Sequence, residues 1–109
     1  MGNRSKLLLF DPDKKMSRTA PLFEDTRSLD LICMGRVAVD LYAEQVYSHL
    51  KDAQSFRKYL GGCAGNTAVG TARLGLKSAM FSCVGTDEMG LFLRETLEKE
   101  GVDTTLLRS

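Results

Sequence analysis

The fold is indicated most clearly by one glycine-rich segment of the chain, Gly61-Gly62-Cys63-Ala64-Gly65-Asn66-Thr67-Ala68. Glycine at this density costs too much backbone entropy for the interior of a regular element, so residues 61–65 are predicted to form a turn. The small residues that come next predict a helix over 66–74, and Gly75 provides its C-terminal stop.

A glycine turn that leads into a helix can also bind a ligand. The helix start presents unpaired backbone N–H groups and the positive end of the helix dipole, and the glycines let a ligand approach the backbone. Asn66 can both donate and accept hydrogen bonds, so the segment suits polyhydroxy or anionic ligands. Taken alone, however, the same pattern is more often only a loop.

Strand and helix signals flank this segment on both sides. The apolar runs 31–34 and 79–84 each end at a glycine, and the first is predicted to be a strand buried on both faces of a parallel sheet. Asp87 is predicted to cap a helix over 88–100 that Gly101 terminates. The alternation of strands and helices predicts the α/β class with right-handed crossovers.

The segment between these elements is ambiguous. Val37, Val39 and Leu41 alternate with more polar residues, which predicts extended chain. Farther along, two strands at 46–47 and 56–60 could flank a polar turn, and a helix over 43–50 is an alternative.

Composition excludes several functional classes. The chain has 109 residues with 15 basic and 14 acidic side chains, so neither a nucleic-acid surface nor an electrostatic membrane dock is expected. No apolar run is long enough to span a membrane. The three cysteines have no metal-site spacing and are expected to be buried, reduced thiols, which suits a cytoplasmic protein. Residues 1–28 are polar and without period, and are predicted to be a mobile extension.

Two common phosphate motifs are absent. No two glycines lie two residues apart, which excludes a G-x-G-x-x-G dinucleotide fingerprint. Residues 70–78 look like a Walker A loop with one leucine too many, and their first part is predicted to be helical.

The whole stretch 61–85 resembles the first signature of the PfkB family of carbohydrate kinases: two glycines, a small residue, an asparagine, then Gly75 and Gly85 at the spacings of that family. Residues 35–40 resemble its opening strand, and residues 84–90 and 100–104 also fit, so the resemblance covers 29–109. It implies an α/β fold, namely the N-terminal part of a ribokinase-like three-layer parallel sheet, with a small β lid over about 41–60.

The resemblance also implies roles for individual residues. Asp40 would bind sugar hydroxyls, Gly61 and Gly62 would bring the backbone to the sugar, and Asn66 would bond a hydroxyl. Segments 35–42, 58–62 and 70–76 are most similar to a family member that acts on a sugar acid, which would carry a carboxylate. Independently of the resemblance, Arg36 and Lys58 are candidates to pair with that carboxylate, and the alternative is that both are ordinary surface charges.

The Gly-Ala-Gly-Asp motif that carries the catalytic base of the family has no counterpart here, so no catalytic residue and no metal ligand is assigned. The implied reaction uses ATP and Mg²⁺, for which no binding residues are identified. The chain also ends as a new strand begins, at residues 105–107, which suggests a truncated sheet with an exposed edge. We therefore expect the substrate-side part of a sugar-acid kinase. Alternatives are a kinase of another sugar, a non-catalytic sugar-binding or interaction module, and an inactive truncation product. A homo-oligomer could form through the lid or the sheet edge.

Overall fold

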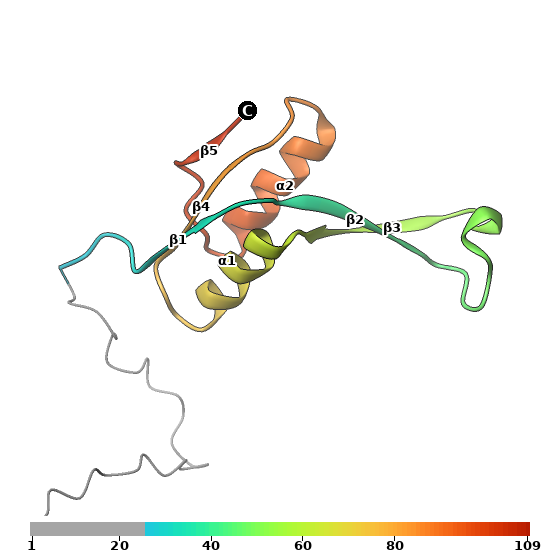
Figure 1. Cartoon of the computed structure of the whole chain (residues 1–109), viewed down its shortest axis with the longest axis horizontal. Helices are drawn as coiled ribbons and strands as arrows, with labels where there is room; N and C mark the ends of the chain where they lie inside the picture. The colour runs from blue at the N-terminus through green and yellow to red at the C-terminus, as the bar shows by residue number, and fades with distance from the viewer. Residues whose placement is uncertain (1–25) are drawn as a thin grey trace, which may run out of the picture.

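A computed structural model describes residues 26–109, and most of the predicted N-terminal extension lies outside the described residues. Two sheets organise the described chain, a parallel sheet in the order β1-β4-β5 and an antiparallel hairpin of β2 and β3 (Figure 1). In chain order the elements are β1 (Leu31–Met34), β2 (Ala38–Ala43), the 3₁₀ helix η1 (Leu50–Asp52), β3 (Phe56–Gly61), α1 (Cys63–Arg73), β4 (Ser78–Cys83), α2 (Glu88–Lys99) and β5 (Leu107–Arg108).

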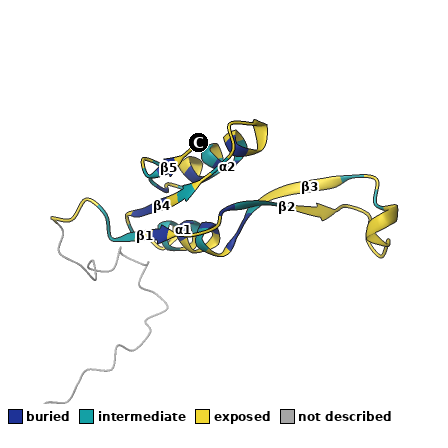
Figure 2. Cartoon of the chain, turned by 45° about the horizontal axis from the view of Figure 1, so that its top comes forward, coloured by how far each residue is buried: buried dark blue, intermediate teal, exposed yellow. Residues whose placement is uncertain are grey.

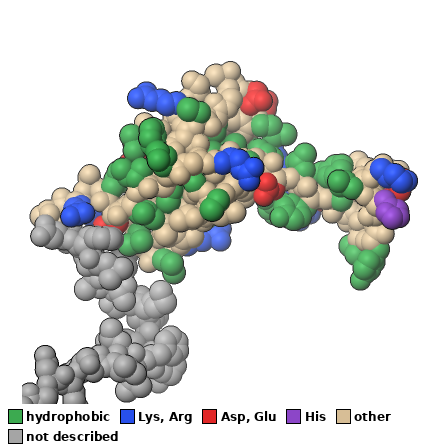
Figure 3. Space-filling model, viewed as in Figure 1, with side chains coloured by type: hydrophobic (Ala, Val, Ile, Leu, Met, Phe, Trp, Pro, Cys, Tyr) green, Lys and Arg blue, Asp and Glu red, His purple; other side chains and the backbone are tan. Residues whose placement is uncertain are grey.

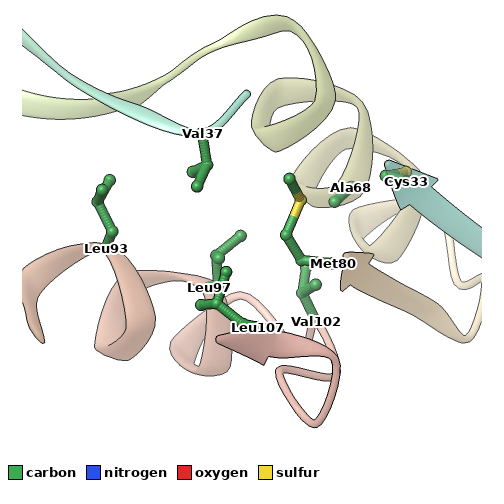
Figure 4. Close-up of a cluster of buried hydrophobic side chains, with 8 residues drawn as sticks. All are labelled: Cys33, Val37, Ala68, Met80, Leu93, Leu97, Val102 and Leu107. Carbon is green, nitrogen blue, oxygen red and sulfur yellow. The ribbon is translucent and has the colours of Figure 1, made fainter. Parts of the chain in front are cut away.

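Both helices cover the same face of the parallel sheet. The crossovers β1-α1-β4 and β4-α2-β5 step across the sheet in the same direction, and right-handed crossovers of this kind place their helices on one side. The buried cluster under the helices includes Cys33, Met80 and Leu107, which come from the three strands (Figure 4). Ala68 of α1 and Leu97 of α2 pack against them and are fully buried.

The opposite face of the sheet is open among the described residues. Ile32, Met34 and Phe81 point to it because they alternate with the buried positions, and they are 50, 75 and 46% exposed. The prediction that the first strand is buried on both faces is therefore wrong for this segment. The predicted parallel sheet is confirmed, with β1 paired to β4. The third strand predicted near the end of the chain is present as β5, which pairs parallel with β4.

Helix α2 has the predicted start and nearly the predicted end. The side chain of Asp87 accepts a hydrogen bond from the Gly90 N–H at 2.9 Å, as an N-cap should. Gly101 follows the helix with a φ of +81°, a conformation that favours glycine.

Helix α1 begins at Cys63, three residues earlier than predicted. The glycine turn is shorter than expected, because Gly61 ends β3, Gly62 is the N-cap and Gly65 is already helical. Gly65 is required by packing, since a Cβ there would lie 2.9 Å from Val37 Cγ2. Contact with the neighbouring segment thus outweighs the poor helix propensity of glycine.

The hairpin β2–β3 projects from the body of the molecule as an arm, most of which is exposed (Figures 1 and 2). The alternative of a helix over 43–50 is wrong, and so is a strand at 46–47, where Tyr47 adopts a φ of +63°. The side chain of Gln45 instead organises the tip. Its Oε1 accepts hydrogen bonds from the N–H groups of Gln54 and Ser55, which closes the loop across nine and ten residues.

The three cysteines differ in exposure. Cys33 is buried, which raises the pKa of its thiol, but Cys63 and Cys83 are exposed, so the expectation of three buried cysteines is wrong for two of them. Across residues 26–109, no helix combines the length and apolar character needed to cross a membrane.

Candidate functional site

An open hollow of about 450 Å³ lies where the hairpin meets the start of α1. Its lining residues come from three elements: Asp40 and Tyr42 of β2, Tyr59 and Leu60 of β3, and Asn66 of α1. Leu60 pairs with Val39, so its side chain points to the opposite face of the hairpin, toward the core. The volume falls within the range typical of small-molecule sites. The structure thus brings together Asp40 and Asn66, two of the four polar or charged side chains that the sequence proposed for ligand binding.

Gly61 makes room for the carboxylate of Asp40. Asp40 lies on β2 next to the Ala38–Gly61 pair, and a Cβ added to Gly61 would lie only 2.0 Å from Asp40 Oδ2. Any side chain at position 61 would therefore displace this carboxylate.

Gly62 joins the hairpin to α1 in a conformation that suits glycine. Its φ is +87°, and a Cβ there would lie 2.5 Å from the backbone oxygen of Arg36. The two glycines therefore have different roles: Gly61 clears space for a side chain, and Gly62 lets two backbone segments approach.

The start of α1 is electrostatically open. Gly62 provides no side-chain cap, and the first turn contains no acidic residue. The first N–H groups of a helix have no partner within the helix, so this end carries partial positive charge. Asn66 lies within this first turn and faces the same hollow as Asp40. A hydroxyl group could donate to Asp40 and accept from Asn66, which is the chemistry needed to hold a polyhydroxy ligand.

The hairpin presents two different faces. Cross-strand pairing places Asp40 opposite Tyr59 and Tyr42 opposite Arg57, so these four side chains share the face that borders the hollow. The rings of Tyr42 and Tyr59 meet edge to face, with centroids 5.4 Å apart and an interplanar angle of 88°. The pKa of Arg57 is raised above its ordinary value, mainly by its contact with the Tyr59 hydroxyl and to a smaller extent by the Glu44 carboxylate.

Sequence reasoning missed Tyr42, Tyr59 and Leu60 as lining residues. The period of two along β2 gives Tyr42 once Asp40 is chosen. Tyr59 and Leu60 require the strand register, which the sequence did not provide.

The two basic residues proposed to pair with a carboxylate lie elsewhere. Lys58 pairs with Leu41 on the opposite face of the hairpin from Asp40, and its Nζ lies 4.6 Å from the ring centroid of Phe92 on α2. This placement contradicts a role for Lys58 in the hollow. Arg36 is exposed and is not among the lining residues, while its backbone oxygen accepts a hydrogen bond from the Gly65 N–H at 3.4 Å. Its ligand role stays a prediction.

A second hollow, of about 300 Å³, lies beside the start of α2 between Gly85 and Ser109. Its one basic side chain, Arg94, donates to the backbone oxygen of Leu107 and to Ser109 Oγ, both at 2.9 Å. These bonds hold the last residues of the chain against α2, so this arginine has a structural role.

Comparison with known proteins identifies the family. A family model described as pfkB family carbohydrate kinase matches residues 28–109. The chain belongs to this family. Asp40 of β2, the Gly61–Gly62 pair and Asn66 at the hollow are thus set in a PfkB framework.

Similar proteins carry names of sugar kinases. The 5-dehydro-2-deoxygluconokinases of Geobacillus thermodenitrificans and Clostridium tetani are 37% identical over 83 residues and 42% identical over 81 residues. These matches take up 76 and 74% of this chain and 25 and 24% of the relatives. This PfkB chain therefore spans about a quarter of the length of the curated relatives it matches.

Solved structures agree with the fold. A PfkB protein from Polaromonas sp. JS666 superposes with a TM-score of 0.70 at 38% identity, covering 73% of this chain and 27% of that one. An uncharacterised sugar kinase from Pyrococcus horikoshii gives a TM-score of 0.68 at 40% identity, with coverages of 72 and 27%. The mixed α/β architecture with a parallel sheet is therefore that of PfkB kinases.

Proposed function

We propose that this chain is the substrate-side part of a kinase that phosphorylates a sugar acid, 5-dehydro-2-deoxy-D-gluconate, on its terminal hydroxyl with ATP. The observation that carries the proposal is the placement of the Asp40 carboxylate over Gly61, facing Asn66 across one hollow. Relatives named for this substrate at 35–42% identity support the choice of substrate. We further propose that the reaction takes place in the cytoplasm, as a step of bacterial inositol breakdown.

The hollow would hold the sugar by its hydroxyl groups. Asp40 accepts hydrogen bonds from them, and each charge-assisted bond of this kind contributes about 1.5–3 kcal/mol. Asn66 adds a donor and an acceptor beside the open end of α1. The hairpin would close over the bound sugar as a lid, and this would exclude water that could otherwise accept the phosphoryl group.

ATP and Mg²⁺ are proposed to bind to residues outside this chain. Among residues 26–109, no three His, Cys, Asp or Glu side chains cluster closely enough to hold a metal ion. The sequence also has no Gly-Ala-Gly-Asp motif. The part of the residues described here would be to bind and orient the sugar for phosphoryl transfer.

A hybrid kinase tests this function. Residues 29–109 would be joined to the C-terminal three quarters of the Geobacillus thermodenitrificans relative, and folding would be checked by a cooperative melt and by ATP binding. We expect the hybrid to phosphorylate 5-dehydro-2-deoxygluconate with a kcat/KM higher than for neutral ketoses. A folded, ATP-binding hybrid that phosphorylates only neutral sugars would contradict the proposed substrate. One that phosphorylates no sugar would favour a non-catalytic binding module.

A further inference from the structure

One basic side chain lies on the polar face of the hairpin, beyond the hollow. Asp40 pairs with Tyr59, and the next pair along the same face is Tyr42 with Arg57. Positions two residues apart on a strand are separated by about 7 Å. The face therefore offers, in order, a carboxylate that accepts from hydroxyl groups, two aromatic rings and a guanidinium.

The guanidinium of Arg57 is exposed to solvent, and the Tyr59 hydroxyl and the Glu44 carboxylate both contact it. Its side chain is 66% exposed, and its ion pair with Glu44 is a contact of 3.3 Å through one nitrogen, Nη2. A guanidinium carries five N–H donors in a planar fork that matches a carboxylate in bidentate fashion. Glu44 contacts only one nitrogen of the guanidinium, so a carboxylate of a ligand could bind at its remaining N–H groups or replace Glu44.

Other basic side chains of the hairpin and α1 are engaged elsewhere, and Arg36 is exposed but is not among the residues that line the hollow. Lys58 lies over the Phe92 ring on the other face of the hairpin. Arg73 is held by Glu100 through two bonds of 2.7 Å at the far end of α1. Figure 3 shows basic atoms at the tip of the arm, where Lys51 contacts Asp52 at 2.8 Å, well beyond the lining residues.

We propose that Arg57 binds the carboxylate of the substrate and makes the site selective for a sugar acid over a neutral sugar. This inference rests on the proposed function. A sugar acid whose hydroxyls bond Asp40 and Asn66 would extend along Tyr59 and Tyr42, and its carboxylate would reach Arg57. Tyrosine rings suit the middle of such a ligand, since they offer an apolar face together with a polar hydroxyl.

The test uses the hybrid kinase with two substrates, 5-dehydro-2-deoxygluconate and its methyl ester, which has the same carbon chain without the charge. Arg57→Gln should raise KM for the acid by about 10- to 100-fold and leave KM for the ester and for ATP unchanged. Arg57→Lys should give an intermediate KM, because it keeps the charge but loses the bidentate fork. Lys51→Gln is the matched control, which removes a positive charge from the same hairpin outside the site.

A second measurement separates a ligand role from a structural one. KM for the acid should rise with salt in the unsubstituted hybrid and in Lys51→Gln, and this dependence should be largely lost in Arg57→Gln. Equal KM values for the acid in Arg57→Gln and Lys51→Gln would overturn the assignment while leaving the kinase function intact. A folded hybrid that phosphorylates neither substrate would overturn the proposed function, and this assignment with it.

Discussion

Gly61→Ala tests the link between the glycine pair and the sugar site. The added methyl group would lie 2.0 Å from Asp40 Oδ2, 2.4 Å from its Cγ and 2.7 Å from Oδ1. All three of these atoms belong to one carboxyl group, so the whole group must move. Restoring ordinary contact at 3.4 Å or more requires a displacement of more than about 1 Å.

The displacement should cost binding rather than folding. A hydrogen bond lengthened by that much is lost, and a bond to a charged group contributes about 1.5–3 kcal/mol, so sugar affinity should fall by about 10- to 100-fold. Stability should change by less, because alanine in a strand recovers roughly 0.5–1 kcal/mol of the backbone entropy that glycine costs. The assay is KM for 5-dehydro-2-deoxygluconate in the hybrid kinase, together with its melting temperature.

Gly70→Ala is the matched control, since a Cβ at this helical position meets nothing within 4 Å. It should leave KM unchanged and raise the melting temperature slightly. In an Asp40→Ala background, Gly61→Ala should have no further effect on KM, because the carboxylate that it displaces is already absent. A Gly61→Ala hybrid with unchanged KM for the sugar would refute the reasoning.

Four further predictions follow from the described contacts. Gly62→Ala should lower the melting temperature of the hybrid kinase by more than Gly70→Ala changes it. Position 62 has a φ of +87°, and its Cβ would lie 2.5 Å from a backbone oxygen. Equal melting temperatures for the two variants would contradict this. Asp87→Ala should lower the free energy of unfolding by about 1 kcal/mol in urea titration, and Asp87→Asn by much less, because asparagine can still accept the capping hydrogen bond. Equal free energies of unfolding for Asp87→Ala and the unsubstituted protein would show that the cap contributes nothing. Hydrogen bonds from Arg73 hold the pKa of Glu100 below its ordinary value. The pair therefore stabilises the fold above the pH where an unfolded glutamate titrates, and this stabilisation is lost as the pH falls through the lowered pKa. Arg73→Gln should make the free energy of unfolding fall less steeply with acid, and an unchanged pH dependence would argue against the pair. The 109-residue chain alone should self-associate through its open sheet face or edge, and Phe81→Lys should reduce this in size-exclusion chromatography; a clean monomer before substitution would contradict it.

Elements with local signals were predictable from the sequence. The cap at Asp87 and the stop at Gly101 act within a few residues, so α2 was placed to within one residue of its observed end. The strands 31–34 and 79–84 were also recognised, because a short apolar run that ends at glycine needs no distant partner to be identified.

Features that depend on distant contacts were not predictable. The early start of α1 follows from the close fit of Gly65 against Val37, and the tip of the hairpin follows from bonds between Gln45 and the backbone of Gln54 and Ser55. Neither pairing has a sequence signature.

Only part of the candidate site could be predicted from the sequence. Asp40 and Asn66 belong to recognisable motifs, whereas Tyr59 and Arg57 reach the same face only through the register of β2 and β3. A slip of one residue would turn them to the other side of the hairpin. Sequence reasoning therefore proposed Lys58, which lies on the opposite face of the hairpin from Asp40, and missed its neighbour Arg57.

The central claim is that Asp40 binds the sugar, and Asp40→Asn in the hybrid kinase tests it most directly. The substitution keeps the size of the side chain but removes the charge that strengthens its bonds to hydroxyl groups. We predict that KM for 5-dehydro-2-deoxygluconate rises by about 10- to 100-fold while KM for ATP stays within about twofold. An equal rise in both KM values, or no rise in the KM for the sugar, would contradict the account.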